Sequence, residues 1–230
     1  MTDYGTQQTR ISAAIATFAS QLPWRTSALA RRAKRAIDLV IAIPASLAAV
    51  PVAGTVALLV RATSKGPVLL RQTRVGLDGQ LFTMWKFRTM LAHDSTGFAA
   101  GRSEVTREDP RLTPIGRVLR DWRLDELPQL AHVLAGQMSL VGPRPDLPEN
   151  VPHYAEEHLI RFAMPPGCTA WTFTRGAFAN DWSTRQAINA EYVKAWSWTL
   201  DLRVLLGTVG VLLAQRNTSP DQATRPEGQR

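Results

Sequence analysis

The chain has little of what supports several common kinds of site. Its 230 residues include one cysteine, Cys168, so an internal disulfide framework is excluded. The four histidines show no metal-binding spacing, and neither a P-loop nor a dinucleotide-binding glycine pattern is present. Disorder is disfavoured, because a hydrophobic content of 45% is ordinary for a chain that buries a core. The length indicates one domain, or one domain with an appendage.

Acidic residues are scarce at the start of the chain. Residues 1–75 contain ten basic and two acidic residues, a difference of +8, whereas residues 76–230 contain 17 of each. The formal net charge of +8 therefore belongs to one end of the molecule. A nucleic-acid-binding protein usually carries its excess charge across the binding fold. This distribution argues against nucleic acid as a partner.

Charge is absent from a long apolar segment in this basic region. Residues 39–60 are 22 residues without a charge, and a helix of about 20 apolar residues crosses a bilayer. Pro44 and Pro51 lie inside the segment, and each removes a backbone donor, which predicts a break or kink. The alternatives are an ordinary membrane span and the buried core helix of a soluble protein.

Both flanks of the apolar segment are positively charged. The flanking cations are Arg31, Arg32, Lys34 and Arg35 before it, and Arg61, Lys65, Arg71 and Arg74 after it. Because cytoplasmic flanks carry the Lys/Arg excess, this symmetry predicts that both ends stay on the cytoplasmic side. The helix would then enter one leaflet, bend near Pro51 and return. Anionic membrane lipids would hold the flanks, each cation contributing about 1 kcal/mol near the surface.

The rest of the chain predicts a mainly α fold with a short β-hairpin, that is, an α+β protein. Asp78-Gly79 is a turn signal, with strands expected at residues 67–72 and 81–87. Helices are expected at residues 113–123, 129–134, 152–161, 182–198 and 200–213, and loops at 91–110 and 141–148. The expected organisation is an N-terminal extension (1–30), a membrane helix with basic flanks (31–65), a catalytic domain (66–213) and a disordered tail (214–230).

Two adjacent carboxylates, Asp125 and Glu126, stand just before an expected helix. Alone they are typical of a helix N-terminus, where acidic side chains favour the positive end of the dipole. Three basic groups change that interpretation: alternating Lys86 and Arg88, helically spaced Arg117, Arg120 and Arg123, and Arg144 in a proline-flanked turn. Separately, these groups also suit an interfacial strand, a solvated helix face and a structural turn. Together they suit a phosphate-bearing ligand, with the carboxylates holding a divalent metal or attacking phosphorus.

An ordered set of motifs passes through these residues. The motifs occupy residues 86–90 (Lys-Phe-Arg-Thr-Met), 109–116, 124–130 (Leu-Asp-Glu-Leu-Pro-Gln-Leu), 138–145, 192–197 and 200–202. Each is weak by itself, but the ordered set is specific. At these positions the chain resembles the small monotopic phosphoglycosyl transferases among the bacterial sugar transferases, over about residues 34–213.

The resemblance implies a fold, a location and a reaction. The family's helix is re-entrant, breaks at a proline that Pro51 matches, and stays in one leaflet. Its catalytic region lies on the cytoplasmic side of the bacterial inner membrane. Members transfer a sugar-1-phosphate from a UDP-sugar to polyprenyl (undecaprenyl) phosphate and release UMP. That reaction is the first membrane step of exopolysaccharide, capsule or O-antigen assembly.

The resemblance also implies roles for single residues. Asp125 is expected to be the nucleophile that carries a covalent phosphosugar, and Glu126 to hold metal or act as a base. Mg²⁺ is the expected cofactor on these two carboxylates, since it suits oxygen ligands and offsets their repulsion from a diphosphate. The expected phosphate-binding cations are Lys86, Arg88, Arg120 and Arg144.

The chain departs from the family pattern after Pro166. Ala170 replaces a common glycine, the Arg175-Gly176 pair reverses the usual order, and Asn189 stands where aspartate is common. An alternative function is therefore a non-catalytic, membrane-anchored protein that binds nucleotide sugars or partners.

Overall fold

The computed structural model describes residues 4–91, 109–176 and 182–217. The α-helices are α1 Tyr4–Phe18, α2 Pro23–Thr26, α3 Ala28–Thr63, α4 Pro114–Asp121, α5 Gln129–Leu134, α6 Trp171–Thr174, α7 Trp182–Lys194 and α8 Trp198–Asn217. The strands are β1 Leu69–Val75, β2 Leu81–Phe87, β3 Ser139–Val141 and β4 Gly167–Thr169. Short 3₁₀ helices are η1 Ala19–Gln21, η2 Leu77–Gly79, η3 Leu124–Glu126, η4 Pro148–His153 and η5 Glu156–Ala163. The predicted mainly helical fold with a β-hairpin is confirmed.

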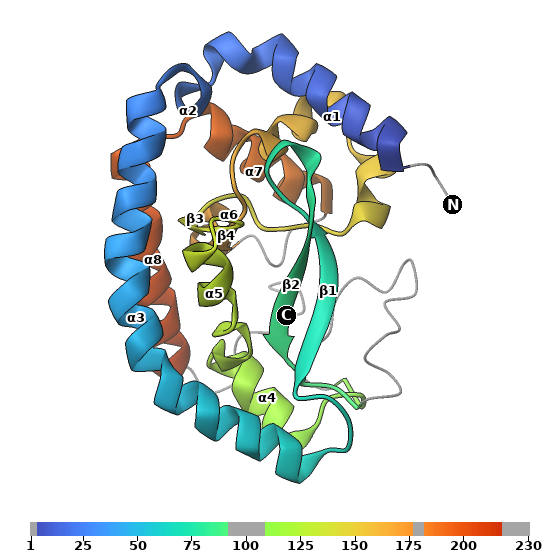
Figure 1. Ribbon diagram of the computed structural model, residues 1–230, viewed down its shortest axis with the longest axis vertical. Helices are drawn as coiled ribbons and strands as arrows, with labels where there is room; N and C mark the ends of the chain where they lie inside the picture. The colour runs from blue at the N-terminus through green and yellow to red at the C-terminus, as the bar shows by residue number, and fades with distance from the viewer. Residues whose placement is uncertain (1–3, 92–108, 177–181, 218–230) are drawn as a thin grey trace, which may run out of the picture.

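Helix α3 forms one long edge of the molecule (Figure 1). It begins where the Ser27 hydroxyl accepts a hydrogen bond from the amide of Ala30, and it is continuous through Pro44 and Pro51. Figure 1 shows that it bends around the rest of the chain rather than running straight. The Thr55 hydroxyl donates to the carbonyl of Pro51, a contact that favours bending. The prolines therefore kink the helix without ending it.

Much of the surface of α3 is apolar and exposed. Val40, Leu47 and Leu58 are each at least 70% exposed. The helix is long and apolar enough to cross a membrane, and only 11% of its apolar 18-residue stretch is buried. This exposure argues against a buried core helix of a soluble protein, because such a helix hides its apolar side chains.

Three of the eight flanking cations attach α3 to its neighbours, which corrects the expectation that all of them face lipid. Lys34 is 2% exposed and its Nζ lies 2.5 Å from Oδ2 of Asp201 in α8. Arg35 donates to the carbonyls of Val133 and Leu134 at the end of α5. Arg31 donates to the carbonyls of residues 24 and 25. These cations attach α3 to its neighbours.

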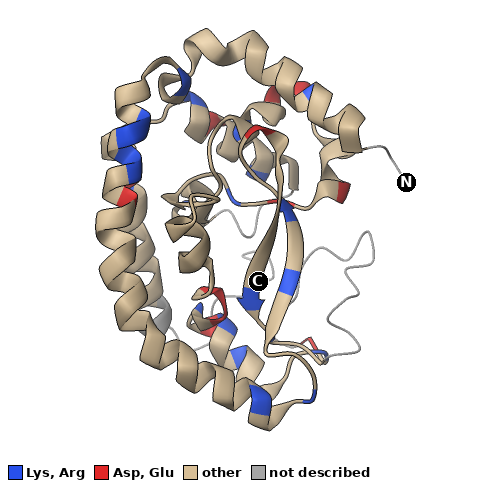
Figure 2. Cartoon of the chain, in the orientation of Figure 1, with Lys and Arg blue, Asp and Glu red and all other residues tan. Residues whose placement is uncertain are grey.

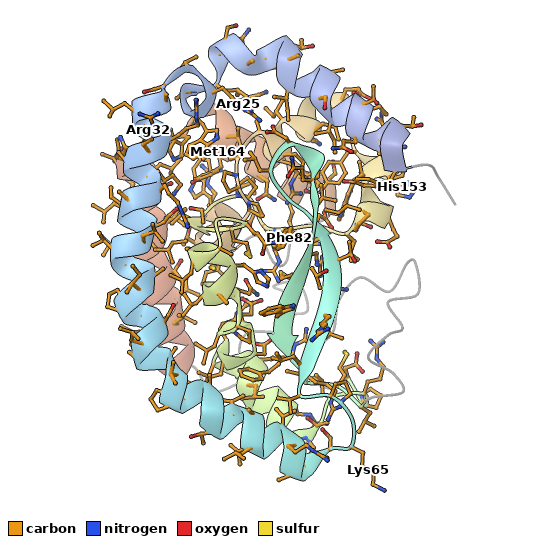
Figure 3. The ribbon with its side chains drawn as sticks, viewed as in Figure 1. Arg25, Arg32, Lys65, Phe82, His153 and Met164 are labelled. Atoms are coloured by element: carbon orange, nitrogen blue, oxygen red, sulfur yellow. The ribbon has the colours of Figure 1, made fainter. Side chains whose placement is uncertain are left out.

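The remaining flank cations divide between the surface and the protein interior. Arg32, Arg61, Lys65 and Arg71 are exposed, and Figure 3 labels Arg32 near one end of α3 and Lys65 just beyond the other. Arg74 instead lies on β1 and is half-buried.

Asp38, the one acid near the apolar segment, is buried and binds the first strand of a small parallel pair. Its carboxylate accepts from the Ser139 hydroxyl at 2.7 Å and from the amide of Leu140. Strand β3 pairs with β4 in parallel, an element that the sequence did not predict. A Cβ on Gly167 would lie 2.1 Å from the amide nitrogen of Gly142, so the two backbones touch only because both residues are glycine.

The hairpin β1–β2 crosses the middle of the molecule (Figure 1). It turns at Asp78 and Gly79, which both have positive φ, and the predicted second strand matches β2. The N-terminal extension packs on this turn through α1, where the hydroxyl of Tyr4 donates to the carbonyl of Gly79 at 2.8 Å. Arg25 of α2 pairs with Asp78 in the same turn. Residues 4–26 are therefore folded onto the domain.

Several predicted boundaries differ from the structure. Residues 152–161 were expected to be helical and form parts of two 3₁₀ segments, η4 and η5. The single helix predicted at 182–198 ends at Lys194, and α8 begins at Trp198. Helix α8 also continues to Asn217, four residues into the expected tail. Most of the loop predicted at 91–110, and residues 218–230 of the tail, lie outside the described residues.

Candidate active site

Helix α4 is positioned by contacts between two of the motifs. The Thr113 hydroxyl accepts from the amide of Gly116 at 2.9 Å, which caps the helix. The Thr113 amide donates to the carbonyl of Thr89, and a Cβ on Gly116 would lie 2.0 Å from that same oxygen. Residues 109–116 therefore pack directly against the end of the motif at residues 86–90.

Arg123 ends this helical region with a left-handed backbone, at φ 56°. The chain reverses there and forms η3, a single turn that carries Asp125 and Glu126. The predicted carboxylate pair thus lies between α4 and α5. Figure 2 shows a red segment between α4 and α5, close to the blue end of β2 and to the blue positions of α4.

Three cations surround one oxygen of Glu126. Its Oε1 lies 3.1 Å from Nζ of Lys86, 3.7 Å from Nη1 of Arg123 and 3.7 Å from Nη2 of Arg144. Burial opposes ionisation of this carboxyl, but Lys86, Arg144 and Arg123 outweigh it and lower its pKa to about 2. Glu126 is therefore ionised at neutral pH.

Asp125 has the opposite electrostatic environment. It is 8% exposed, and its Oδ1 is buried without a hydrogen-bond partner in the described part of the chain. Burial and the neighbouring Glu126 raise its pKa to about 6, while Lys86, Arg120 and Arg123 act against the rise. A buried carboxylate oxygen without a donor is costly, so it is a natural position for a ligand.

Arg144 reaches Glu126 from a loop that is fixed by the polypeptide around it. Its amide donates to Oδ1 of Asn189 at 3.1 Å, and its carbonyl accepts from the buried Arg161. Asp146, two residues on, accepts from the hydroxyl of Tyr154 and pairs with Arg161. The backbone of Arg144 is thus held on both sides.

Comparison with known proteins gives the family that the sequence motifs resemble. A family model described as bacterial sugar transferase matches residues 29–215. The chain belongs to the bacterial sugar transferase family. The match includes α3, the hairpin and the carboxylate pair of this bacterial sugar transferase, and it begins after α1 and α2.

Several curated proteins are similar to this sugar transferase. An undecaprenyl-phosphate glucose phosphotransferase of Komagataeibacter xylinus is 39% identical over 195 residues, covering 80% of this chain and 36% of that protein. A UDP-glucose:undecaprenyl-phosphate glucose-1-phosphate transferase of Escherichia coli is 37% identical over 192 residues, covering 80% and 40%. An exopolysaccharide production protein of Rhizobium leguminosarum is 37% identical over 188 residues, covering 76% and 92%. The chain thus spans about two fifths of the first two relatives.

The structure places the predicted phosphate-binding cations unequally. Lys86 and Arg144 contact Glu126, and Arg120 acts electrostatically on Asp125. Arg88 is buried elsewhere, where its Nη2 donates to the carbonyl and the hydroxyl of Ser64 at 2.8 Å, just beyond α3. These two hydrogen bonds attach the end of α3 to the residue that follows β2, and neither involves the carboxylate pair.

Sequence reasoning left two site residues out of its phosphate-binding set. Arg123 is grouped by its spacing with Arg117 and Arg120 among the cations that suit a phosphate-bearing ligand, but it is not one of the four expected phosphate-binding residues. Arg74 is expected to be part of the membrane flank. In the hairpin, Arg74 pairs with Phe82, so it shares a face with Lys86. Continuing the expected strand to residue 75 would have placed these two cations on one side of the sheet.

Glu126 lines a narrow cavity. Its lining includes Arg74, Lys86, Gln129, Arg144 and Cys168. Burial raises the pKa of the Cys168 thiol to about 12, so no thiolate is present at neutral pH. The cavity is therefore basic rather than nucleophilic.

The two carboxylates fit a magnesium ion better than a metal that needs several side chains. No group of three or more His, Cys, Asp or Glu side chains with metal-binding geometry occurs among residues 4–91, 109–176 and 182–217. Mg²⁺ often takes one or two protein carboxylates and completes its shell with water and substrate phosphates. Oδ1 of Asp125, which has no hydrogen-bond partner among the described residues, is consistent with such a ligand set.

Proposed function

We propose that this bacterial sugar transferase moves a sugar-1-phosphate from a UDP-sugar to polyprenyl (undecaprenyl) phosphate. The observation that carries the proposal is the arrangement of Asp125 and Glu126. Three cations lie around Glu126, and within the described part of the chain one oxygen of Asp125 has no hydrogen-bond donor. The relatives, which include a glucose-1-phosphate transferase and an exopolysaccharide production protein, support the same reaction.

In the first step, a carboxylate oxygen of Asp125 attacks the phosphorus that bears the sugar. The P–O bond to the bridging oxygen breaks, and its electron pair leaves with UMP. With a pKa of about 6, Asp125 is mostly ionised at pH 7 and is more basic than an ordinary aspartate. Carboxylate nucleophiles of this kind form covalent intermediates. The product is a phosphosugar on Asp125.

In the second step, a phosphate oxygen of the polyprenyl acceptor attacks the same phosphorus. The bond to Asp125 breaks, the carboxylate is regenerated, and polyprenyl-diphospho-sugar is formed. No net proton transfer is needed when the acceptor phosphate is ionised. Two successive displacements at one phosphorus are each easier than a single direct transfer from the UDP-sugar to the polyprenyl phosphate, since both substrates are anions.

The cations around Glu126 neutralise charge on the phosphates. Lys86 and Arg144 are directed at the carboxylate pair, and Arg120 lies close enough to influence Asp125. A guanidinium binds two phosphate oxygens at once, while an ammonium acts as a point charge. Asp125 and Glu126 would hold Mg²⁺, which supplies additional neutralisation of the diphosphate when bound.

The membrane helix places this chemistry at the lipid surface. Polyprenyl phosphate keeps its phosphate at the interface and its tail among the acyl chains. We infer that α3 enters one leaflet of the bacterial inner membrane, bends at Pro51 and returns, leaving the catalytic domain in the cytoplasm. Arg32, Arg61, Lys65 and Arg71 are the exposed flank cations that would meet anionic lipid. Catalysis gains from such positioning of the acceptor.

The test is UMP release by the full chain in lipid nanodiscs, with UDP-glucose, undecaprenyl phosphate and Mg²⁺. Multiple turnovers are expected with the acceptor. Without it, release should stop at or below one UMP per chain, because the phosphosugar stays on Asp125. Asp125→Asn should abolish both, and EDTA should abolish turnover until Mg²⁺ is added back. Nucleotide-sugar binding without UMP release, unchanged in Asp125→Asn, would support the non-catalytic alternative instead.

A further inference from the structure

Arg123 has a backbone conformation that its side chain disfavours. Its φ of 56° lies in the left-handed region, which glycine adopts freely and a long side chain does not. Within the described ranges, the other non-glycine residue with positive φ is Asp78 in the hairpin turn. Aspartate tolerates that conformation in turns, whereas arginine has no such preference. Strain of this kind persists where surrounding contacts require a particular side chain.

The guanidinium of Arg123 is held between Glu126 and an aromatic ring. Nη1 lies 3.7 Å from Oε1 of Glu126, and Cζ lies 4.9 Å from the centroid of the Phe173 ring. Phe173 is buried in α6, which belongs to the segment that departs from the family pattern. Glycine at position 123 would suit the backbone but would remove both contacts.

The charges around Glu126 indicate a second anion. Lys86, Arg123 and Arg144 share one carboxylate oxygen, so three cations face a single negative charge. Counting Asp125 as well still leaves more cations than carboxylates. The 3.7 Å separation from Arg123 is longer than a hydrogen bond, so the carboxylate does not use the planar geometry of the guanidinium. A phosphate would use it, by accepting two parallel N–H bonds.

We propose that Arg123 is a phosphate-binding residue of this active site and that Phe173 is a positioning residue that directs its guanidinium. The proposal rests on the proposed function and names the group that Arg123 binds. That group is a phosphate, either of the nucleotide-sugar donor or of the polyprenyl acceptor. It also gives α6 a role in the reaction.

The central experiment compares Arg123→Gly with wild type in the nanodisc assay. The glycine variant loses the guanidinium and gains an unstrained backbone. Its kcat/KM for UMP release should fall by about ten-fold or more, the worth of a charged hydrogen bond, while its Tm stays equal or rises. Arg123→Lys, which keeps the charge without the planar fork, should lie between the two. Asp78→Gly is the matched control, because it frees the same conformation away from the site and should leave kcat/KM unchanged.

Two kinetic arms identify which phosphate Arg123 binds. If it binds the donor, Arg123→Gly raises KM for UDP-glucose and slows the UMP release seen without acceptor. If it binds the acceptor, the variant raises KM for undecaprenyl phosphate and leaves the acceptor-free release intact. Phe173→Leu should change the same parameter by a smaller factor. Phe173→Leu should have no further effect in the Arg123→Gly variant, because the guanidinium that Phe173 positions is then already absent.

Wild-type kcat/KM in Arg123→Gly would overturn the proposal. So would a loss that accompanies a lowered Tm and disappears on assay at lower temperature, because the role would then be structural. If wild type releases no UMP, the proposed function itself fails. Direct binding of UDP-glucose and of undecaprenyl phosphate then still tests Arg123, and equal Kd values for wild type and Arg123→Gly would refute its role.

Discussion

The ammonium group of Lys86 lies 3.1 Å from Oε1 of Glu126, which joins the end of β2 to η3. Glu126 is also approached by Arg123 and Arg144, so Lys86 is the closest of three cations on one oxygen. This relationship fixes the carboxylate next to Asp125. It also concentrates positive charge where a diphosphate would bind.

Lys86→Met should lower kcat/KM for UMP release by roughly 100-fold, the usual effect of removing one preorganised charge from an active site. The methionine is similar in length and apolar, so it fills the same buried space. Lys86→Arg is the matched control and should recover part of the loss, because it keeps the charge. Steady-state kinetics in nanodiscs measure both, and equal activities for the methionine and arginine variants would contradict an electrostatic role.

Asp125→Asn should abolish turnover and stabilise the fold at the same time. Folding raises the pKa of this carboxyl from its ordinary value of 3.8 to about 6, so the ionised form is disfavoured in the folded chain. The cost appears as pH rises from about 4 to 6 and is fully present above that. Asparagine removes the cost, roughly 2–3 kcal/mol at pH 8.

Thermal unfolding across pH checks this sign. The gain in Tm for Asp125→Asn should be present at pH 8 and should vanish near pH 4, where wild-type Asp125 is protonated. Glu126→Gln is the opposite case, because cations hold its pKa low and the ionised form is favoured. It should lose stability at pH 8, and a gain there would show that the cation cluster does not stabilise Glu126.

The rate of UMP release should fall as the pH drops through about 6. Protonated Asp125 has no free electron pair of sufficient basicity to attack phosphorus, so kcat/KM should lose about ten-fold per pH unit below that point. Lys86 favours the ionised form of Asp125. Its replacement by methionine should therefore move the acid limb to higher pH. A wild-type profile that is flat between pH 5 and 8 would remove Asp125 as the titrating nucleophile.

The sequence predicted the local elements of the site better than its long-range contacts. Strand β2 and helix α5 lie at the predicted residues because a turn signal and a helix-start proline define them locally. The carboxylate pair with Lys86 and Arg144 was also predicted, since the residue types themselves suggest phosphate chemistry.

Long-range partners explain what sequence reasoning missed. Lys34 looked like a lipid-facing cation, yet its partner Asp201 is 167 positions away and no local pattern connects them. Arg88 looked like a phosphate ligand because it alternates with Lys86, but the end of α3 captures its side chain. The β3–β4 pair is too short for a periodic signal and depends on the contact between two glycines.

Lys34→Met and Arg32→Met separate the structural cations from those proposed to face the membrane. Lys34 pairs with Asp201 in the interior, so its replacement leaves a buried carboxylate without its cation and should cost roughly 3–5 kcal/mol. Arg32 is exposed, and its replacement should change stability by less than about 0.5 kcal/mol. Thermal unfolding in detergent measures both changes. Binding to anionic vesicles should weaken for Arg32→Met, and equal Tm losses in the two variants would contradict the division.

The bend of α3 should decide on which side of the membrane its two ends lie. A straight helix over residues 39–60 would be about 33 Å long, enough to cross the hydrocarbon core. With Pro51 in place, single cysteines at the exposed positions 32 and 65, in a Cys168→Ser background, should both be labelled by impermeant maleimide only from the cytoplasmic side. Pro51→Ala restores a backbone donor and removes a clash, so part of the population should straighten and expose one end to the periplasm.

Pro44→Ala is the matched control, because α3 also contains that proline. It should leave position 65 cytoplasmic if the bend at Pro51 returns the helix. Periplasmic labelling of either position in the chain with both prolines intact would show that α3 is an ordinary span.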